Sequence, residues 1–138
     1  MVACGGQKKE KLSENKYVVE WEFETENYRV KIDTASNGMY RYRSWSKSKQ
    51  ITDEPDLVLE NGVKECWCDP AVEVCDCDTT YEGGENAVLG FIFTFKNGEY
   101  RYEYKTGWWK GRVIDELLVY NKGEEILRER GGYRDLDR

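Results

Sequence analysis

Residues 91–104, FIFTFKNGEYRYEY, carry the pattern that decides the fold of this chain. Phenylalanine occupies every second position of residues 91–95, and tyrosine occupies every second position of residues 100–104. A period of two places alternate side chains on one face of a β-strand. Asn97-Gly98 lies between the two runs, and Asn-Gly tolerates the positive φ angles of a tight turn. The stretch therefore predicts a β-hairpin with aromatic side chains on matched faces.

The same alternation extends in both directions from this hairpin. In residues 17–23 it places Tyr17, Val19, Trp21 and Phe23 on one face. Further strand patterns cover residues 28–32, 39–45, 56–60, 117–120 and 126–127, with turns expected at Asn37-Gly38, Asn61-Gly62 and Asn121-Lys122-Gly123. We predict an all-β fold of about eight to nine short strands, either an antiparallel β-sandwich or a partly closed barrel.

Composition limits the classes of function. The 138 residues include 27 Asp and Glu against 21 Lys and Arg, and the formal charge is −6. An acidic chain lacks the basic footprint of a general nucleic-acid binder, so we expect no nucleic-acid partner. The sequence has no histidine, which excludes Ser-His-Asp and Cys-His catalysis and His-ligated metal sites. No spacing of carboxylates singles out a general acid with its base, so we expect a protein that is not an enzyme.

The first residues indicate a location. Met1-Val-Ala-Cys4-Gly-Gly6 is followed by the polar stretch Gln7–Lys11, and this arrangement resembles the lipobox of bacterial lipoproteins. The resemblance implies that Cys4 carries a lipid anchor in the membrane and that residues 5–16 form a flexible tether. The expected localisation is then the bacterial cell envelope. The alternative is that Met1 is the true start and that the protein is cytoplasmic.

Three segments follow from this interpretation: a lipobox remnant and tether at 1–16, one β-domain at 17–130 and a charged tail at 131–138. Within the β-domain, the order of YRYRSWSK (40–47), PDLVL (55–59), FKNGEYRY (95–102) and LLVY (117–120) resembles uncharacterised small secreted bacterial proteins. That resemblance implies a fold, and it assigns a role to no individual residue.

Four cysteines lie in a short insert at residues 65–78, which we expect to form a Cys-rich hairpin. Their numbers are symmetric, so one antiparallel register sets Cys66 opposite Cys77 and Cys68 opposite Cys75, on one face. Facing residues in such a ladder have Cα atoms about 4.5 to 5.5 Å apart, which suits disulfides. Four cysteines allow three full pairings, and sequence alone does not choose among them.

The same four sulfurs could instead hold zinc, the one cofactor that the sequence suggests. The compartment decides between these chemistries, because an oxidising envelope favours disulfides and a reduced cytosol favours metal. Acidic residues surround the insert and disfavour the reactive thiolate, so we expect a stapled hairpin without redox catalysis.

Two features could form a binding surface. The first is a basic-aromatic strip in which cationic side chains interleave with aromatic ones; it consists of Tyr40, Arg41, Tyr42, Arg43 and Trp45. The second is Gly107-Trp108-Trp109-Lys110-Gly111, where two adjacent indoles point opposite ways on an extended chain, so one of them is free to contact a partner. Each feature has a structural alternative, an ordinary amphipathic strand for the first and a tryptophan folded over the core for the second.

The sequence therefore predicts a non-catalytic, lipid-anchored envelope protein that binds another protein or a surface polysaccharide. Two alternatives from other classes remain: a small metal-binding protein with a four-Cys zinc site, and an inhibitor or immunity-type protein that binds one partner tightly.

Overall fold

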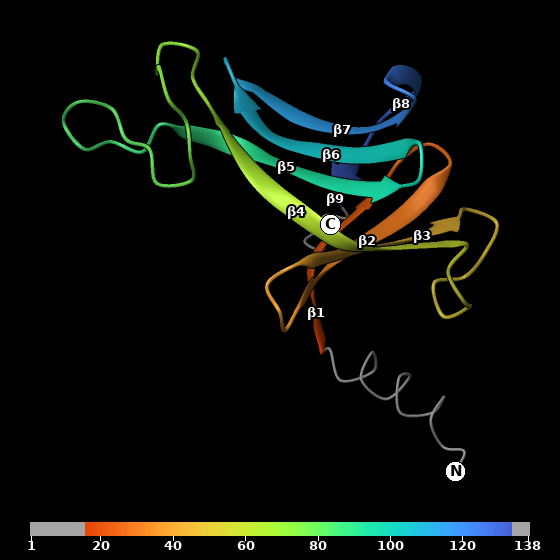
Figure 1. Ribbon diagram of the computed structural model, residues 1–138. Helices are drawn as coiled ribbons and strands as arrows, with labels where there is room; N and C mark the ends of the chain where they lie inside the picture. The colour runs from red at the N-terminus through yellow and green to blue at the C-terminus, as the bar shows by residue number, and fades with distance from the viewer. Residues whose placement is uncertain (1–15, 134–138) are drawn as a thin grey trace.

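The computed structural model describes residues 16–133, which form one antiparallel sheet curled into a half-barrel (Figure 1). The strands are β1 (Tyr17–Glu24), β2 (Tyr28–Ala35), β3 (Tyr40–Ser46), β4 (Leu57–Cys68), β5 (Val88–Asn97), β6 (Tyr100–Trp109), β7 (Arg112–Asn121), β8 (Glu124–Arg130) and β9 (Gly132–Tyr133). Each of the strands β1 to β7 pairs with the next strand in sequence, and β9 pairs with β1, so that β8 and β9 lie at the two edges of the sheet. The predicted all-β, partly closed barrel is confirmed. Among the described residues, no helix is long and apolar enough to cross a membrane.

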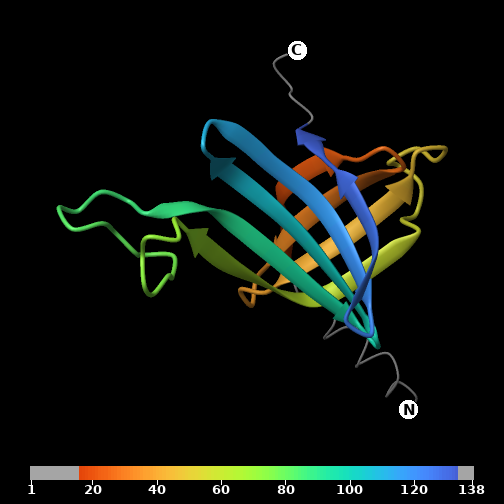
Figure 2. The ribbon, with the colours of Figure 1, turned by 90° about the horizontal axis from the view of Figure 1, so that it is seen from above.

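Strand β4 joins the two walls of the half-barrel. Its first half pairs with β3 and its second half pairs with β5. Seen from above, β1–β3 form one wall and β5–β8 form the other, with the core between them (Figure 2). The loop at residues 69–87 extends away from the sheet beyond the end of β4.

The predicted turn at Asn61-Gly62 is wrong. These two residues lie inside β4 and do not connect two strands. Asn61 has a φ of 62°, and the register with β3 shifts at this point. A shift of this kind is a β-bulge, which bends a strand without ending it. Gly62 is required there because a Cβ atom would lie 2.1 Å from the Phe95 ring. The bend allows β4 to pass from one wall to the other.

The prediction that Tyr17, Val19, Trp21 and Phe23 share one face of β1 is wrong, because the strand contains a second bulge. Its register with β2 shifts between Val19 and Trp21, and one extra residue reverses which side chains face inward. Phe23 is buried in the core and Trp21 packs against it, whereas Val19 is exposed. The period of two is therefore broken in the middle of the strand.

Aromatic side chains from both walls fill the core. The rings of Phe23 and Tyr104 stack with centroids 3.8 Å apart, and Tyr40 meets Phe93 edge to face at 5.2 Å. The buried cluster consists of Phe23, Val30, Ile32, Tyr42, Leu59, Phe93, Phe95, Tyr104 and Leu117. The hairpin predicted from residues 91–104 thus supplies much of this core.

The two edges of the sheet meet near the β1–β2 turn. The amide of Asn27 donates a 2.6 Å hydrogen bond to the Glu129 carboxylate on β8. The chain then crosses through Gly131 to β9, which pairs with β1 opposite Phe23. Residues 132–133 of the predicted charged tail are therefore a short strand, and residues 134–138 lie outside the described residues.

Candidate binding site

The arginines of the basic-aromatic strip do not form a free cationic surface. Arg43 donates two hydrogen bonds to the Asp33 carboxylate, at 2.8 and 2.9 Å, and Arg41 donates a third at 2.8 Å. Asp33 is fully buried, and the Arg41 guanidinium also lies 3.5 Å from the centre of the Tyr17 ring. The positive charges of the strip are thus directed at one buried carboxylate, which makes this cluster a structural element.

The aromatic members of the strip are also structural. Trp45 is 2 % exposed, and its indole nitrogen donates to the backbone carbonyl of Asp53 at 2.7 Å. Tyr40 packs on Phe93 in the core. Tyr42 is 2 % exposed. The structure thus gives these side chains packing roles, and a contact surface at this strip stays a prediction; Tyr42 also borders the cavity described below.

Trp108 and Trp109 differ in exposure, as expected for adjacent residues of a strand, whose side chains point to opposite faces. Trp108 is 47 % exposed at the end of β6, while Trp109 is partly buried and lies near Lys110, whose ammonium is 5.2 Å from its ring. Trp108 thus remains available as a contact. It lies at the β6–β7 hairpin, far along β6 from the strand's first residue, Tyr100.

The four cysteines of the insert form two disulfides, Cys66–Cys77 and Cys68–Cys75. This is the pairing of the symmetric register, one of the three that the sequence leaves open. Residues 75–77 are nevertheless not a ladder strand, because β4 pairs with β5 over this stretch. The insert is therefore a stapled loop and not a regular hairpin. Since all four thiols are used, zinc binding would require the reduced form.

No group of three or more Asp, Glu, Cys or His side chains suited to a metal is found within residues 16–133. Cys4, the predicted lipidation site, lies outside the described residues.

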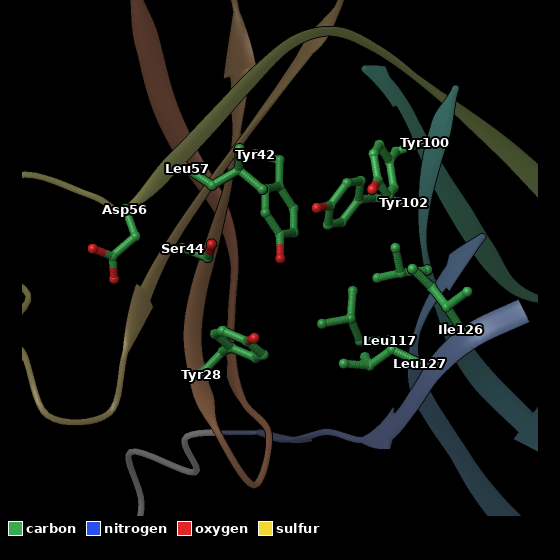
Figure 3. Close-up of a pocket in the computed structure, with 11 residues that line it drawn as sticks. Tyr28, Tyr42, Ser44, Asp56, Leu57, Tyr100, Tyr102, Leu117, Ile126 and Leu127 are labelled. Atoms are coloured by element: carbon green, nitrogen blue, oxygen red, sulfur yellow. The ribbon is translucent and has the colours of Figure 1, made fainter. Parts of the chain in front are cut away.

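A cavity of about 350 Å³ lies between the walls of the half-barrel, at the end where β2, β4 and β6 begin (Figure 3). We call it the tyrosine cavity. Its lining residues come from both walls; they are Tyr28, Tyr42, Ser44, Asp56, Leu57, Tyr100, Tyr102, Leu117, Val119, Ile126 and Leu127. The volume falls at the lower end of the range of about 300–1,000 Å³ that is typical of small-ligand sites, and barrel mouths are a common place for them.

The tyrosine cavity has two chemically different sides (Figure 3). Aliphatic side chains of β7 and β8, including Leu117 and Leu127, form one side. Tyrosine rings form much of the rest, and the rings of Tyr42 and Tyr102 lie 5.5 Å apart. The hydroxyl of Tyr102 points toward Tyr42. The cavity thus offers both apolar surface and hydrogen-bonding groups.

The lining carries no uncompensated charge. The Asp56 carboxylate is paired with Lys49 at 2.7 Å and accepts from the backbone nitrogen of Ser46. Glu129, which acts electrostatically on Tyr42, is held by Asn27. Burial raises the pKa of both Tyr42 and Tyr102 above the usual range for tyrosine, so their hydroxyls stay neutral near pH 7.

The alternation of residues 100–104 predicts a strand but not this cavity. One signal was available: β5 carries phenylalanine at its inward positions, whereas β6 carries tyrosine at Tyr100, Tyr102 and Tyr104. A buried tyrosine hydroxyl requires a partner or water. Tyrosines on the inner face of one strand therefore indicate a polar or open region inside the fold.

No family model, curated protein or solved structure matches this chain.

Proposed function

We propose that this chain is a non-catalytic binding protein of the bacterial cell envelope, anchored through a lipid on Cys4, which captures another protein or a surface polysaccharide. The observation that supports the proposal best is the tyrosine cavity. Elsewhere between the walls aromatic side chains pack closely, whereas at this end a hollow with apolar and hydrogen-bonding surface stays open.

The position of β1 agrees with an anchored protein. Tyr17, at the start of β1, pairs with Ala35, whereas the cavity residue Tyr28 lies at the other end of β2. Eight strand residues separate these ends by roughly 20 Å. A lipid attached before Tyr17 would therefore hold the chain by the end remote from the cavity, which leaves the cavity free for a partner outside the membrane.

The experiment compares two single charges introduced at exposed apolar positions. Ile126 lines the cavity and is 54 % exposed, and Val58 is similarly exposed on β4 without lining it. Ile126→Glu and Val58→Glu should both fold, because exposed substitutions usually change stability by less than about 0.5 kcal/mol. Immobilised wild type and both variants are incubated with protein and polysaccharide fractions of the source envelope.

We expect Ile126→Glu to lose at least about tenfold in retained partner, while Val58→Glu retains as much as the wild type. Equal retention by all three proteins would contradict the proposal. Loss caused by Trp108→Ala and not by Ile126→Glu would move the contact to the β6–β7 hairpin. Stoichiometric retention of a single enzyme would instead identify an inhibitor.

Intact mass of the native protein tests the lipid on Cys4.

A further inference from the structure

Three hydroxyls of the tyrosine cavity have no hydrogen-bond partner in the part of the chain that the structure describes. Within residues 16–133, no side chain or backbone group hydrogen-bonds the hydroxyls of Tyr28, Tyr100 or Tyr102. The hydroxyl of Tyr42, by contrast, interacts with Ser44. The free hydroxyls belong to side chains that border the hollow, where water satisfies them until a ligand displaces it.

These free hydroxyls restrict the chemistry of the occupant. A purely apolar group would cover them without replacing their hydrogen bonds to water, and each buried unsatisfied group costs about 1–3 kcal/mol. An occupant must therefore carry donors or acceptors along one edge. It must also present apolar surface, because Leu117 and Leu127 form the opposite side.

The electrostatics restrict the occupant further. The carboxylate of Asp56 is already paired with Lys49, and burial raises the pKa of Tyr42 and Tyr102, so these two hydroxyls stay neutral near pH 7. A charged ligand would lose its hydration without gaining a partner of opposite charge, which is costly. The occupant must therefore be uncharged.

We propose that the tyrosine cavity binds an uncharged sugar residue of a polysaccharide. A pyranose ring combines the required features, since its C–H groups form apolar faces that pack on aromatic rings and its hydroxyls lie along the edge. This inference rests on the proposed binding function and specifies which of its two partner classes enters the cavity.

The test uses saturation-transfer NMR with neutral trisaccharides of glucose, galactose, mannose, rhamnose and N-acetylglucosamine, and with trigalacturonic acid as the charged probe. The uncharged apolar dye N-phenyl-1-naphthylamine is measured in parallel by fluorescence. We expect at least one neutral sugar to bind at millimolar concentrations, and neither the acidic sugar nor the dye to compete with it.

Single hydroxyl deletions locate the site. Tyr102→Phe and Tyr28→Phe should each weaken the binding of that sugar by about five- to tenfold, the value of one hydrogen bond. Tyr120→Phe is the matched control, because this tyrosine packs against Arg101 outside the cavity. It should leave sugar binding unchanged.

Three outcomes would overturn the inference, and they differ in what they mean for the proposed function. If the dye binds, Ile126→Glu abolishes its binding and no neutral sugar binds, the occupant is apolar and the cavity remains a binding site. If no probe binds and Ile126→Glu still retains the envelope partner, both the sugar and the proposed function fail. Sugar binding that Tyr102→Phe and Tyr28→Phe leave unchanged would also exclude the cavity as the sugar site.

Discussion

The polar groups on the two faces of the β2–β3 pair differ in how their hydrogen bonds are satisfied. On one face, the buried Asp33 carboxylate receives three hydrogen bonds from Arg41 and Arg43. On the other, the hydroxyl of Tyr28 borders an open cavity and has no hydrogen-bond partner among residues 16–133. A saturated network stabilises the fold and leaves nothing for a ligand. Polar groups that are held in place but unpaired are the ones suited to binding.

The largest effect is expected where the saturated network is broken. Asp33→Asn removes the charge that compensates Arg41 and Arg43, both of which are largely buried. Removing one partner of a buried ion pair costs about 3–5 kcal/mol, because the other charge stays buried without compensation. Chemical denaturation should show a loss of this size in the free energy of unfolding.

An exposed pair provides the control for this loss. Lys122 in the β7–β8 turn lies 3.8 Å from Glu99 in the β5–β6 turn, and both side chains are mostly exposed. Lys122→Ala should change stability by less than about 1 kcal/mol. If Asp33→Asn is no more costly than Lys122→Ala, the Asp33 cluster does not stabilise the fold, and its arginines become candidates for binding after all.

Asp115 is an intermediate case on the inner face of the other wall. It is buried opposite Thr106, and neither of its carboxylate oxygens has a well-formed hydrogen bond from a residue in the described range. Burial raises the pKa of Asp115 above its usual 3.8, although an interaction with the Tyr104 hydroxyl partly opposes this. Asp115→Asn should therefore stabilise the protein at pH 7 by roughly 1 kcal/mol.

The pH dependence of this gain follows from the direction of the shift. Because the native pKa is raised, the native carboxyl keeps its proton at pH values where the unfolded chain has lost it. The ionised group thus lowers stability as the pH rises from about 4 through the native pKa. The stability difference between Asp115→Asn and wild type should grow from pH 4 to pH 7 in urea titrations. A constant difference would show that ionisation of Asp115 does not affect stability.

The sequence was sufficient to predict the all-β fold and the positions of most strands, because alternation is local. The hairpin of residues 91–104 and the turns at Gly38, Gly98 and Gly123, all with positive φ, lie where the pattern places them. The symmetric cysteine spacing also contained the correct pairing among its options. Each of these features depends only on residues close together in the chain.

The remaining features depend on contacts between distant residues. Asn61-Gly62 has the sequence of a turn, but the Phe95 ring packs against Gly62 and β4 continues through a bulge. The strip around Arg41 has the sequence of a charged surface, but both of its arginines pair with Asp33 on the neighbouring strand. The cavity required knowing which tyrosines face each other across two walls. The bulge and the ion pairs are not encoded in local periodicity, and the inward tyrosines of β6 indicate an open region without showing which side chains lie across from them.

The smallest expected effect separates the two kinds of hydroxyl within the cavity itself. Tyr42→Phe removes a hydroxyl that interacts with Ser44 and should cost about 1 kcal/mol of stability. Tyr102→Phe removes one that has no protein partner within the described residues, and should cost less than about 0.5 kcal/mol. Thermal and urea unfolding of the two variants measure this difference.

If Tyr102→Phe is as costly as Tyr42→Phe, then the Tyr102 hydroxyl has a structural role. In that case the distinction between saturated groups that stabilise the fold and unpaired groups that bind would not hold at this site.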